Sequence, residues 1–364
     1  MTKRQGLRLA VFIVLLGIIL NTMIGVFGFP PNDGTVSIKQ RFGQFYSEPE
    51  NTWDCVMVGA SCVDRQWVAP IAWKDYGMTA YPMNTARQPL ILTVNVLEEV
   101  RKKQDVKLAV VDIRGIRMAA LKPGDVQMRN ILDNMRYSKN RYEAVKKMIS
   151  FYKTYFSRDD VKDGEKMLKK LDEASLYFPF LKYHSRWKTG LYESDFLGVT
   201  SDMKGVYELK AFDVENVNPT KVLDERKELN ELQISVLDEI MDYGKETGLE
   251  ILFVSSPSQL TKNEQPEITA AVDYLESKGA NVINFNTDEK YQEIGIDFSQ
   301  DLYNGHHLNS RGAVKFTNYF AKYLHEHYQF EDKRGREEYK DWDEAYENYV
   351  KFYEAGWKKA ETSK

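Results

Sequence analysis

The chain lacks a surplus of basic residues. Its 364 residues include 50 Lys and Arg against 54 Asp and Glu, which gives a formal net charge of -4, and no basic cluster is interleaved with aromatic side chains. Proteins that bind nucleic acid concentrate positive charge on one face. Nucleic acid is therefore not an expected partner.

Cysteine is scarce, because only Cys55 and Cys62 are present. The apolar run at 55–61 predicts a strand, and seven extended residues at about 3.3 Å each span about 23 Å. A disulfide requires Cα atoms within about 7 Å of each other. We therefore expect two free thiols.

Histidine is also rare, with five residues in the chain. His325 and His327 are two residues apart on a predicted helix, so their side chains point to different faces. The sequence offers no third ligand near them, whereas a zinc site uses three or four protein ligands. No metal and no organic cofactor is predicted, and no internal repeat is evident.

One long uncharged run lies near the N-terminus. Residues 9–32 carry no charge and are rich in Leu, Ile, Val and Phe, and Lys3, Arg4 and Arg8 precede them. About 20 apolar residues suffice for a membrane-spanning helix, and basic residues mark the cytoplasmic side. We expect 1–28 to be a cytoplasmic end and transmembrane anchor. A cleaved signal peptide has the same features and is the alternative.

Short apolar runs alternate with helical patterns in the rest of the chain. Strands are predicted at 55–61, 78–83, 108–113, 251–255 and 281–285. Helices are predicted at 90–103, 223–247 and 264–278, and another begins at about Ser310. This alternation is typical of an α/β fold with a parallel sheet.

The composition also divides the chain into parts. Pro30-Pro31-Asn32-Asp33-Gly34 indicates a linker at 29–50, ahead of an α/β domain at 51–330. A charged, aromatic and helical insertion at about 123–218 interrupts that domain and is expected to cover the site edge of the sheet. A helical appendage with an aromatic stripe follows at 331–364.

A serine follows the first predicted strand. Val58-Gly59-Ala60-Ser61 puts Ser61 at the carboxyl edge of the sheet, where open α/β folds bind ligands. Far along the chain, Tyr303-Asn304-Gly305-His306-His307 ends just before a predicted helix. Histidine is the usual base that activates a serine hydroxyl near neutral pH. The two segments therefore predict a nucleophile and its base.

These segments resemble the first and last sequence blocks of the SGNH/GDSL hydrolase superfamily, and most closely those of its membrane-anchored bacterial branch. The first block is a strand and a small-residue turn that carries the serine, as in Val56-Met57-Val58-Gly59-Ala60-Ser61. The last is Asp-x-x-His, often continued as in His307-Leu308-Asn309 with Gly312 and Ala313. The resemblance covers roughly 53–116 and 247–325. It implies Ser61 as the nucleophile, His307 rather than His306 as the base, and an SGNH-like, flavodoxin-like parallel-sheet sandwich.

The third member of the site departs from the family pattern. Asn304 stands three residues before His307, where the family has aspartate. An asparagine oxygen can hold an imidazole by its Nδ1 hydrogen, but it has no charge to stabilise the imidazolium. Asp301 is the alternative acid.

Other polar residues are candidates for contacts with the oxyanion or the substrate. Asn84 and Gln88 follow the second predicted strand and Arg114 follows the third, at the same sheet edge as Ser61. The glycine and asparagine that the family places there have no match. His184 and Arg186 in the insertion are candidates for binding an anionic or sugar group, with a packing role as the alternative. Cys62 is interpreted as a small turn residue.

The resemblance also implies a function. In that branch of the superfamily, proteins are associated with acyl modification of cell-surface polymers, often beside a multi-span membrane O-acyltransferase. We therefore expect a single-pass protein of the bacterial cell membrane with an extracytoplasmic domain. It would transfer an acyl group, acetyl or D-alanyl, onto a cell-envelope polysaccharide or teichoic-type polymer. The alternatives are a carbohydrate esterase and a non-catalytic partner of the membrane acyltransferase.

Overall fold

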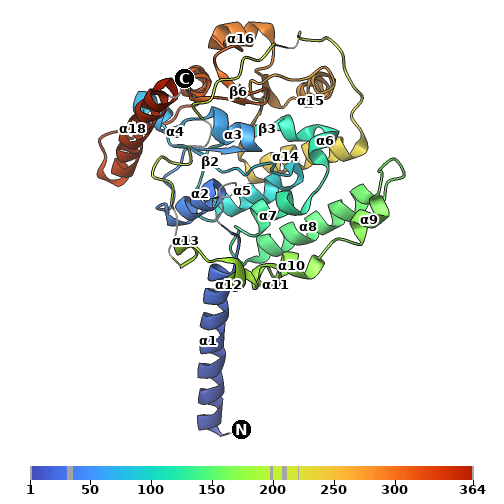
Figure 1. The fold of residues 1–364 in the computed structure, drawn as a ribbon, viewed down its shortest axis with the longest axis vertical. Coiled ribbons are helices and arrows are strands. Elements are labelled where there is room, and N and C mark those ends of the chain that lie inside the picture. Colours follow the sequence, from blue (N-terminus) through green and yellow to red (C-terminus); the bar gives the residue numbers. More distant parts are fainter. Residues whose placement is uncertain (1, 31–35, 197–199, 207–210, 220, 363–364) are drawn as a thin grey trace.

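A five-stranded sheet, with all strands parallel, forms the centre of the molecule. The computed structural model describes residues 2–30, 36–196, 200–206, 211–219 and 221–362 (Figure 1). The strands are β1 (Cys55–Val58), β2 (Ala80–Pro82), β3 (Leu108–Asp112), β4 (Glu250–Ser255) and β5 (Asn281–Asn284). The predicted α/β fold and its parallel sheet are confirmed, and each predicted strand is present. Strand β4 begins one residue earlier than predicted, at Glu250, and the other strands are shorter than predicted.

The order of the strands is β2-β1-β3-β4-β5. The chain runs from β1 to β2 on one side of β1 and then to β3 on its other side. Strands β1 and β3 pair in parallel, and Val58 at the end of β1 lies opposite Val111. Sheets with this order bind ligands beyond the carboxyl ends of the strands where the direction of winding reverses. Ser61 follows β1 and Arg114 follows β3, so both lie at this reversal.

Strands β1, β2 and β3 are buried on both faces, whereas β5 is only partly buried. Every residue of β1, β2 and β3 is buried, as expected for a parallel sheet that helices cover. Helix α5 (Thr93–Arg101) packs on β1 and against α14 (Glu231–Thr247). Helix α17 (Ser310–His327) places Phe316 and Phe320 against Phe285. Each fully buried apolar side chain of this kind stabilises the fold by about 1.5–3 kcal/mol.

One predicted helix begins later than expected. The prediction of 223–247 is wrong for its first residues, because α14 begins at Glu231. Asn230 accepts a hydrogen bond from the Gln233 backbone N–H, and the Gln233 side chain accepts one from the Asn230 N–H. This capping box satisfies donors at the helix start. The predicted helix at 90–103 corresponds to 3₁₀-helix η1 (Leu90–Leu92) followed by α5. The predicted helix at 264–278 corresponds to α15 (Gln265–Ser277).

The insertion at 123–218 was predicted to be helical, which is confirmed up to Phe196, whereas the described residues at 200–206 and 211–218 form no helix. Its helices are α7 (Asp125–Leu132), α8 (Lys139–Phe156), α9 (Gly164–Leu168), α10 (Glu173–Tyr177), α11 (Phe180–Tyr183), α12 (Arg186–Thr189) and α13 (Glu193–Phe196). The remaining elements are α3 (Ser61–Gln66), α4 (Ala69–Tyr76), η2 (Ile113–Ile116), α6 (Met118–Leu121), α16 (Asp288–Ile294), β6 (Leu302–Asn304), β7 (His307–Leu308) and η3 (Glu337–Tyr339).

The segment predicted as a linker is largely packed into the domain. Helix α2 (Val36–Ser47) buries Ile38, Phe42 and Phe45 in the main core. Its apolar residues recur at helical spacing, so burial of one face is the physical reason that the linker prediction is wrong for this helix. The C-terminal appendage forms α18 (Lys340–Thr362), which packs on α4.

Helix α1 (Lys3–Val26) extends away from the sheet and its surrounding helices (Figure 1). Its apolar side chains from Leu7 to Leu20 are largely exposed. Within the described residues, no helix is long and apolar enough to cross a membrane. Of the uncharged run at 9–32, the side chains at 21 and 24 and the whole of 31 and 32 lie outside the description.

Gly59 allows a close approach between the end of β1 and β3. A Cβ atom at this position would lie 2.8 Å from Asp112 Cβ and 3.0 Å from Val63 Cγ2. We expect Gly59→Ala to lower the free energy of unfolding by about 1–3 kcal/mol, the usual cost of overpacking. Gly115→Ala is the matched control, because its Cβ would meet Leu90 Cβ at 3.3 Å. Chemical denaturation of both variants measures the difference, and equal losses would contradict this role of Gly59.

Candidate active site

Ser61 and His307 meet at the carboxyl edge of the sheet. Ser61 is the first residue of α3, directly after the turn that ends β1, and His307 begins β7, which pairs with β6. The Oγ atom of Ser61 lies 2.8 Å from Nε2 of His307, across 246 residues of sequence. Both side chains are partly exposed, so a substrate can reach them. The predicted contact between these two residues is confirmed as geometry.

The contacts of Asn304 determine which nitrogen of His307 carries the proton. Asn304 Oδ1 accepts a hydrogen bond from the His306 backbone N–H at 2.8 Å and lies 3.0 Å from His307 Nδ1. A backbone N–H only donates, so the shared atom is the amide oxygen, and His307 Nδ1 must be the second donor. The neutral imidazole therefore offers the lone pair of Nε2 to the Ser61 hydroxyl, as a general base requires.

Asp301, the alternative acid, is engaged elsewhere. Its carboxylate accepts a hydrogen bond from the Asp297 N–H at 2.7 Å and pairs with Lys315 Nζ at 2.6 Å. The side chain is almost completely buried at this position. Among the described contacts, Asn304 and not Asp301 is the residue that holds His307 Nδ1.

Tyr303 and Arg65 also hold the imidazole. The Tyr303 ring stacks on His307 with ring centroids 5.4 Å apart and an angle of 7° between the planes. Its hydroxyl accepts a hydrogen bond of 2.9 Å from Arg65 Nε. No role was predicted for these two residues from the sequence. The available signal was spacing, because Arg65 lies four residues after Ser61 on one helix and therefore on the same face.

Asp64 is a buried carboxylate beneath this pair. Arg41 and Arg65 pair with it at 2.9 Å and 2.6 Å. Asn84 Nδ2 donates to Asp64 Oδ1 at 2.9 Å and to the Ala60 carbonyl at 3.0 Å. Both amide hydrogens of Asn84 are thus used to hold the turn before Ser61, and neither is free to bind an oxyanion in this conformation.

Arg114 connects the end of β3 to the histidine turn. Its guanidinium donates to the His306 carbonyl at 2.6 Å and to His306 Nδ1 at 2.9 Å. Gln88 stays within its own loop, where its Oε1 accepts from the Thr85 N–H at 3.0 Å. These predicted residues therefore have different roles. Arg114 holds His306, the neighbour of the base, Asn84 holds the turn before Ser61, and Gln88 shapes the loop after β2. The best placed oxyanion donors are the backbone N–H groups at the start of α3, apart from that of Val63, which donates to the Ala60 carbonyl at 3.1 Å.

Arg186 contacts the end of α1, whereas His184 bonds within its own segment. Arg186 donates to the carbonyls of Val26 and Gly28 at 3.3 Å and 3.0 Å and pairs with Asp195. His184 Nδ1 donates to the Leu181 carbonyl at 2.9 Å. None of the described contacts joins either residue to Ser61 or His307, so the alternative, a packing role, fits them.

Cys62 is a buried thiol, and both cysteines are free as predicted. Its Sγ donates to Asp112 Oδ1 at 3.0 Å. Burial, together with the Asp112 carboxylate, raises the pKa of Cys62 well above its ordinary value. The thiolate is the nucleophilic form of cysteine, so Cys62 does not compete with Ser61.

Burial and positive charge determine the protonation of His307. Burial lowers the pKa of His307 to about 3, with Arg65 and Arg114 acting in the same direction and Asp64 opposing them. The imidazole is therefore neutral at physiological pH and able to accept a proton, but the imidazolium that results is poorly stabilised. The site has the parts of a serine acyl-transfer centre with a weak base.

No family model matches the chain, and no curated protein matches it.

Asn304→Asp tests the missing charge. A carboxylate next to Nδ1 favours the imidazolium, so the variant raises the pKa of His307 from its value of about 3. Neutral imidazole is the active base, and the rate falls as the pH drops through its pKa. The acid limb of kcat/KM for a simple acyl ester should therefore move to higher pH. The rate at neutral pH should rise by about tenfold or more, within what a positioned base contributes.

Asn304→Ala is the matched variant, because it removes the acceptor without adding charge. Its rate should fall, since Nδ1 loses the partner that fixes the imidazole. A pH–rate profile that is the same in both variants would show that Asn304 is not the third member of the site.

Proposed function

We propose that this chain is an SGNH-like serine acyltransferase that places an acyl group, acetyl or D-alanyl, on a cell-envelope polysaccharide or teichoic-type polymer. The observation that carries the proposal is the 2.8 Å contact between Ser61 Oγ and His307 Nε2, with Asn304 on the other ring nitrogen. The segments that bear these residues are the ones that resemble the SGNH/GDSL superfamily. The choice of polymer rests on that resemblance.

The geometry supports a two-step reaction. His307 Nε2 takes the hydroxyl proton while Ser61 Oγ attacks the acyl carbonyl, and backbone N–H groups of α3 bind the oxyanion. The leaving group departs with the proton from His307, which leaves an ester on Ser61. A hydroxyl of the polymer then attacks this ester and gives its proton to His307, and Ser61 Oγ recovers that proton when it leaves.

The weak base favours transfer over hydrolysis. Asn304 adds no negative charge, and burial with two arginines keeps the pKa of His307 at about 3. A water molecule that the site does not hold in place then depends on His307, a poor base, for its activation. A bound polymer hydroxyl gains from orientation, which is worth an effective concentration of up to about 10⁵–10⁸ M. A polymer acceptor therefore tolerates the weak base better than water does.

The exposed apolar side chains of α1 support a membrane location. Apolar surface of this extent on one helix is stable when lipid covers it. We therefore keep the proposal of a single-pass protein of the bacterial cell membrane with an extracytoplasmic domain. A multi-span O-acyltransferase that carries the acyl group across the membrane is the proposed partner.

A second candidate function follows from the presence of Asn304 where the family pattern has aspartate. A site without a carboxylate at this position suits a non-catalytic partner of the membrane acyltransferase, in which the domain binds polymer and the histidine does little chemistry. A carbohydrate esterase, with water as the acceptor, needs the stronger base that this site lacks.

An alkyl fluorophosphonate separates an enzyme from a scaffold. Ser61 Oγ would form a bond to phosphorus, fluoride would leave, and His307 would take the hydroxyl proton. We expect mass spectrometry of the full chain in detergent to find the adduct on the peptide that contains Ser61. Ser61→Ala should abolish it, whereas Cys62→Ser should keep it. An adduct that survives in Ser61→Ala, or no adduct on the native chain, would refute the nucleophile.

The acceptor is tested in cells and with purified protein. Cells that carry Ser61→Ala should lose the acyl esters of the envelope polymer, as measured by release of the acid from isolated polymer with alkali. Retained acylation would instead support the non-catalytic partner. Release of free acid from acylated polymer by the purified full chain, without transfer to a second polymer, would identify an esterase.

A further inference from the structure

Exposed large apolar side chains are confined to two places among the described residues. One is α1, from Leu7 to Leu20, and the other is the insertion between residues 126 and 196. Five of the eight in the insertion fall within 178–196, and we call them the aromatic surface: Phe178, Leu181, Trp187, Tyr192 and Phe196. The described parts of the sheet and its covering helices expose none.

The aromatic surface surrounds the point where α1 joins the domain. Figure 1 shows α11, α12 and α13 around the domain end of α1. The rings of Phe27 and Phe180 meet edge to face with centroids 6.1 Å apart. Arg186, next to Trp187, donates to the carbonyls of Val26 and Gly28. The segment that bears the aromatic surface therefore packs against the domain end of α1.

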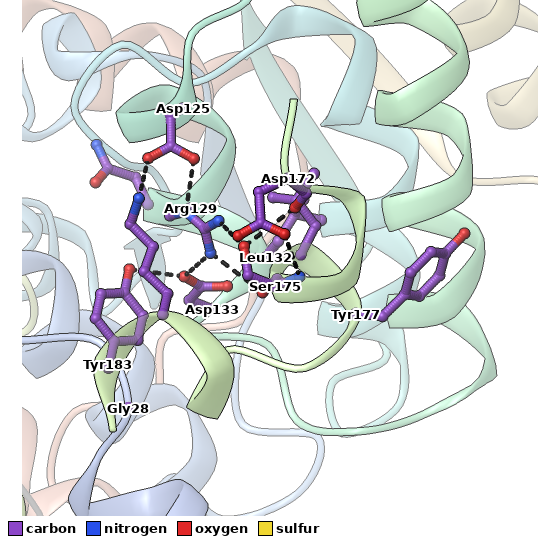
Figure 2. A network of polar contacts seen from close by, with 12 residues as sticks. Gly28, Asp125, Arg129, Leu132, Asp133, Asp172, Ser175, Tyr177 and Tyr183 are labelled. Carbon is purple, nitrogen blue, oxygen red and sulfur yellow. Dashed lines mark hydrogen bonds and ion pairs between the residues drawn. The ribbon is translucent and has the colours of Figure 1, made fainter. Parts of the chain in front are cut away.

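A buried polar network fixes this segment on the rest of the insertion (Figure 2). The Tyr183 hydroxyl donates to Asp133 Oδ2 at 2.8 Å, and Arg129 donates to the same oxygen at 3.3 Å. Arg129 also donates to Ser175 Oγ at 2.6 Å, which ties α7 to α10. The exposure of the aromatic surface is thus enforced by contacts behind it, and the surface cannot fold back onto the core without breaking them.

The chemistry of this surface matches the boundary between lipid and water. Tryptophan and tyrosine concentrate in that layer because their rings are apolar and their tips are polar. Exposed Lys188 lies over the Trp187 ring at 5.2 Å, and His184 is also exposed. Lys182 is exposed as well and pairs with Asp125 at 2.6 Å. Basic side chains among aromatic ones are attracted to anionic lipid head groups.

We propose that the aromatic surface lies in the interface of the membrane that holds α1, as a second contact between the domain and the lipid. This proposal rests on the membrane anchor in the proposed function. With α1 alone the domain can tilt on its helix, whereas two contacts on one face fix its orientation. The edge that carries Ser61 is then held at a constant height above the lipid.

Site-specific labels test the contact in the full chain. Single cysteines at Trp187→Cys and Phe196→Cys carry the fluorophore NBD, while native Cys55 and Cys62 are buried and stay unlabelled. Ile13→Cys reports on α1, and Glu289→Cys on exposed α16, far from α1 in Figure 1, is the matched control. The protein is placed in nanodiscs of phosphatidylcholine and phosphatidylglycerol, with and without a lipid that carries a doxyl quencher high on its acyl chain.

We expect the labels at 187 and 196 to lose about half of their emission, because interfacial segments reach about 5–10 Å into the head-group boundary. The label at 289 should lose none. Quenching at Ile13→Cys without quenching at 187 and 196 would overturn this inference and leave the anchor standing. Absence of quenching at Ile13→Cys would overturn the anchor itself. Shielding of the labels at 187 and 196 only when a multi-span partner is added would assign the surface to protein and overturn the lipid contact.

Discussion

The site depends on the two hydrogen bonds that Arg114 donates to His306. The turn from Asn304 to His307 belongs to a small antiparallel ribbon outside the main sheet, so the sheet itself does not position it. Arg114 follows β3 and donates twice to His306, which brings the turn to the reversal point of the winding where Ser61 begins α3. The contact between Ser61 and His307 is therefore made by three parts of the chain that meet only after the sheet has formed.

The same arginine has an electrostatic consequence. Arg114 and Arg65 both lower the pKa of His307, and buried Asp64, which already pairs with Arg41 and Arg65, opposes them only in part. The surroundings of His307 thus disfavour a positive imidazole. Negative charge that develops on a bound acyl group during attack would offset this repulsion, because an anion near the ring favours the imidazolium. The base then becomes stronger in the transition state than in the resting protein.

The sheet and the contact between Ser61 and His307 could be predicted from the sequence because their signals are local. Strands buried on both faces are continuous apolar runs, and Ser61 and His307 lie in short motifs beside predicted elements. Contacts such as Tyr303 on His307 have no local signal, since they depend on tertiary packing. The true start of α14 did have one, because Asn230 and Gln233 form a capping box, and the prediction overlooked it. The packing of α2 and the contacts of Arg186 with α1 emerge only from the assembled fold.

Asn304 keeps the shape of the site and removes its charge. One oxygen accepts from both the His306 N–H and His307 Nδ1, and a carboxylate oxygen would accept the same two bonds. An asparagine in place of an aspartate therefore does not alter the orientation or the tautomer of His307. Asparagine lacks only the negative charge with which a carboxylate would stabilise the imidazolium. A site built in this way holds the Ser61 hydroxyl against Nε2 of His307 but gives little help to an unbound water, which is the balance that the proposed transfer to a bound acceptor requires.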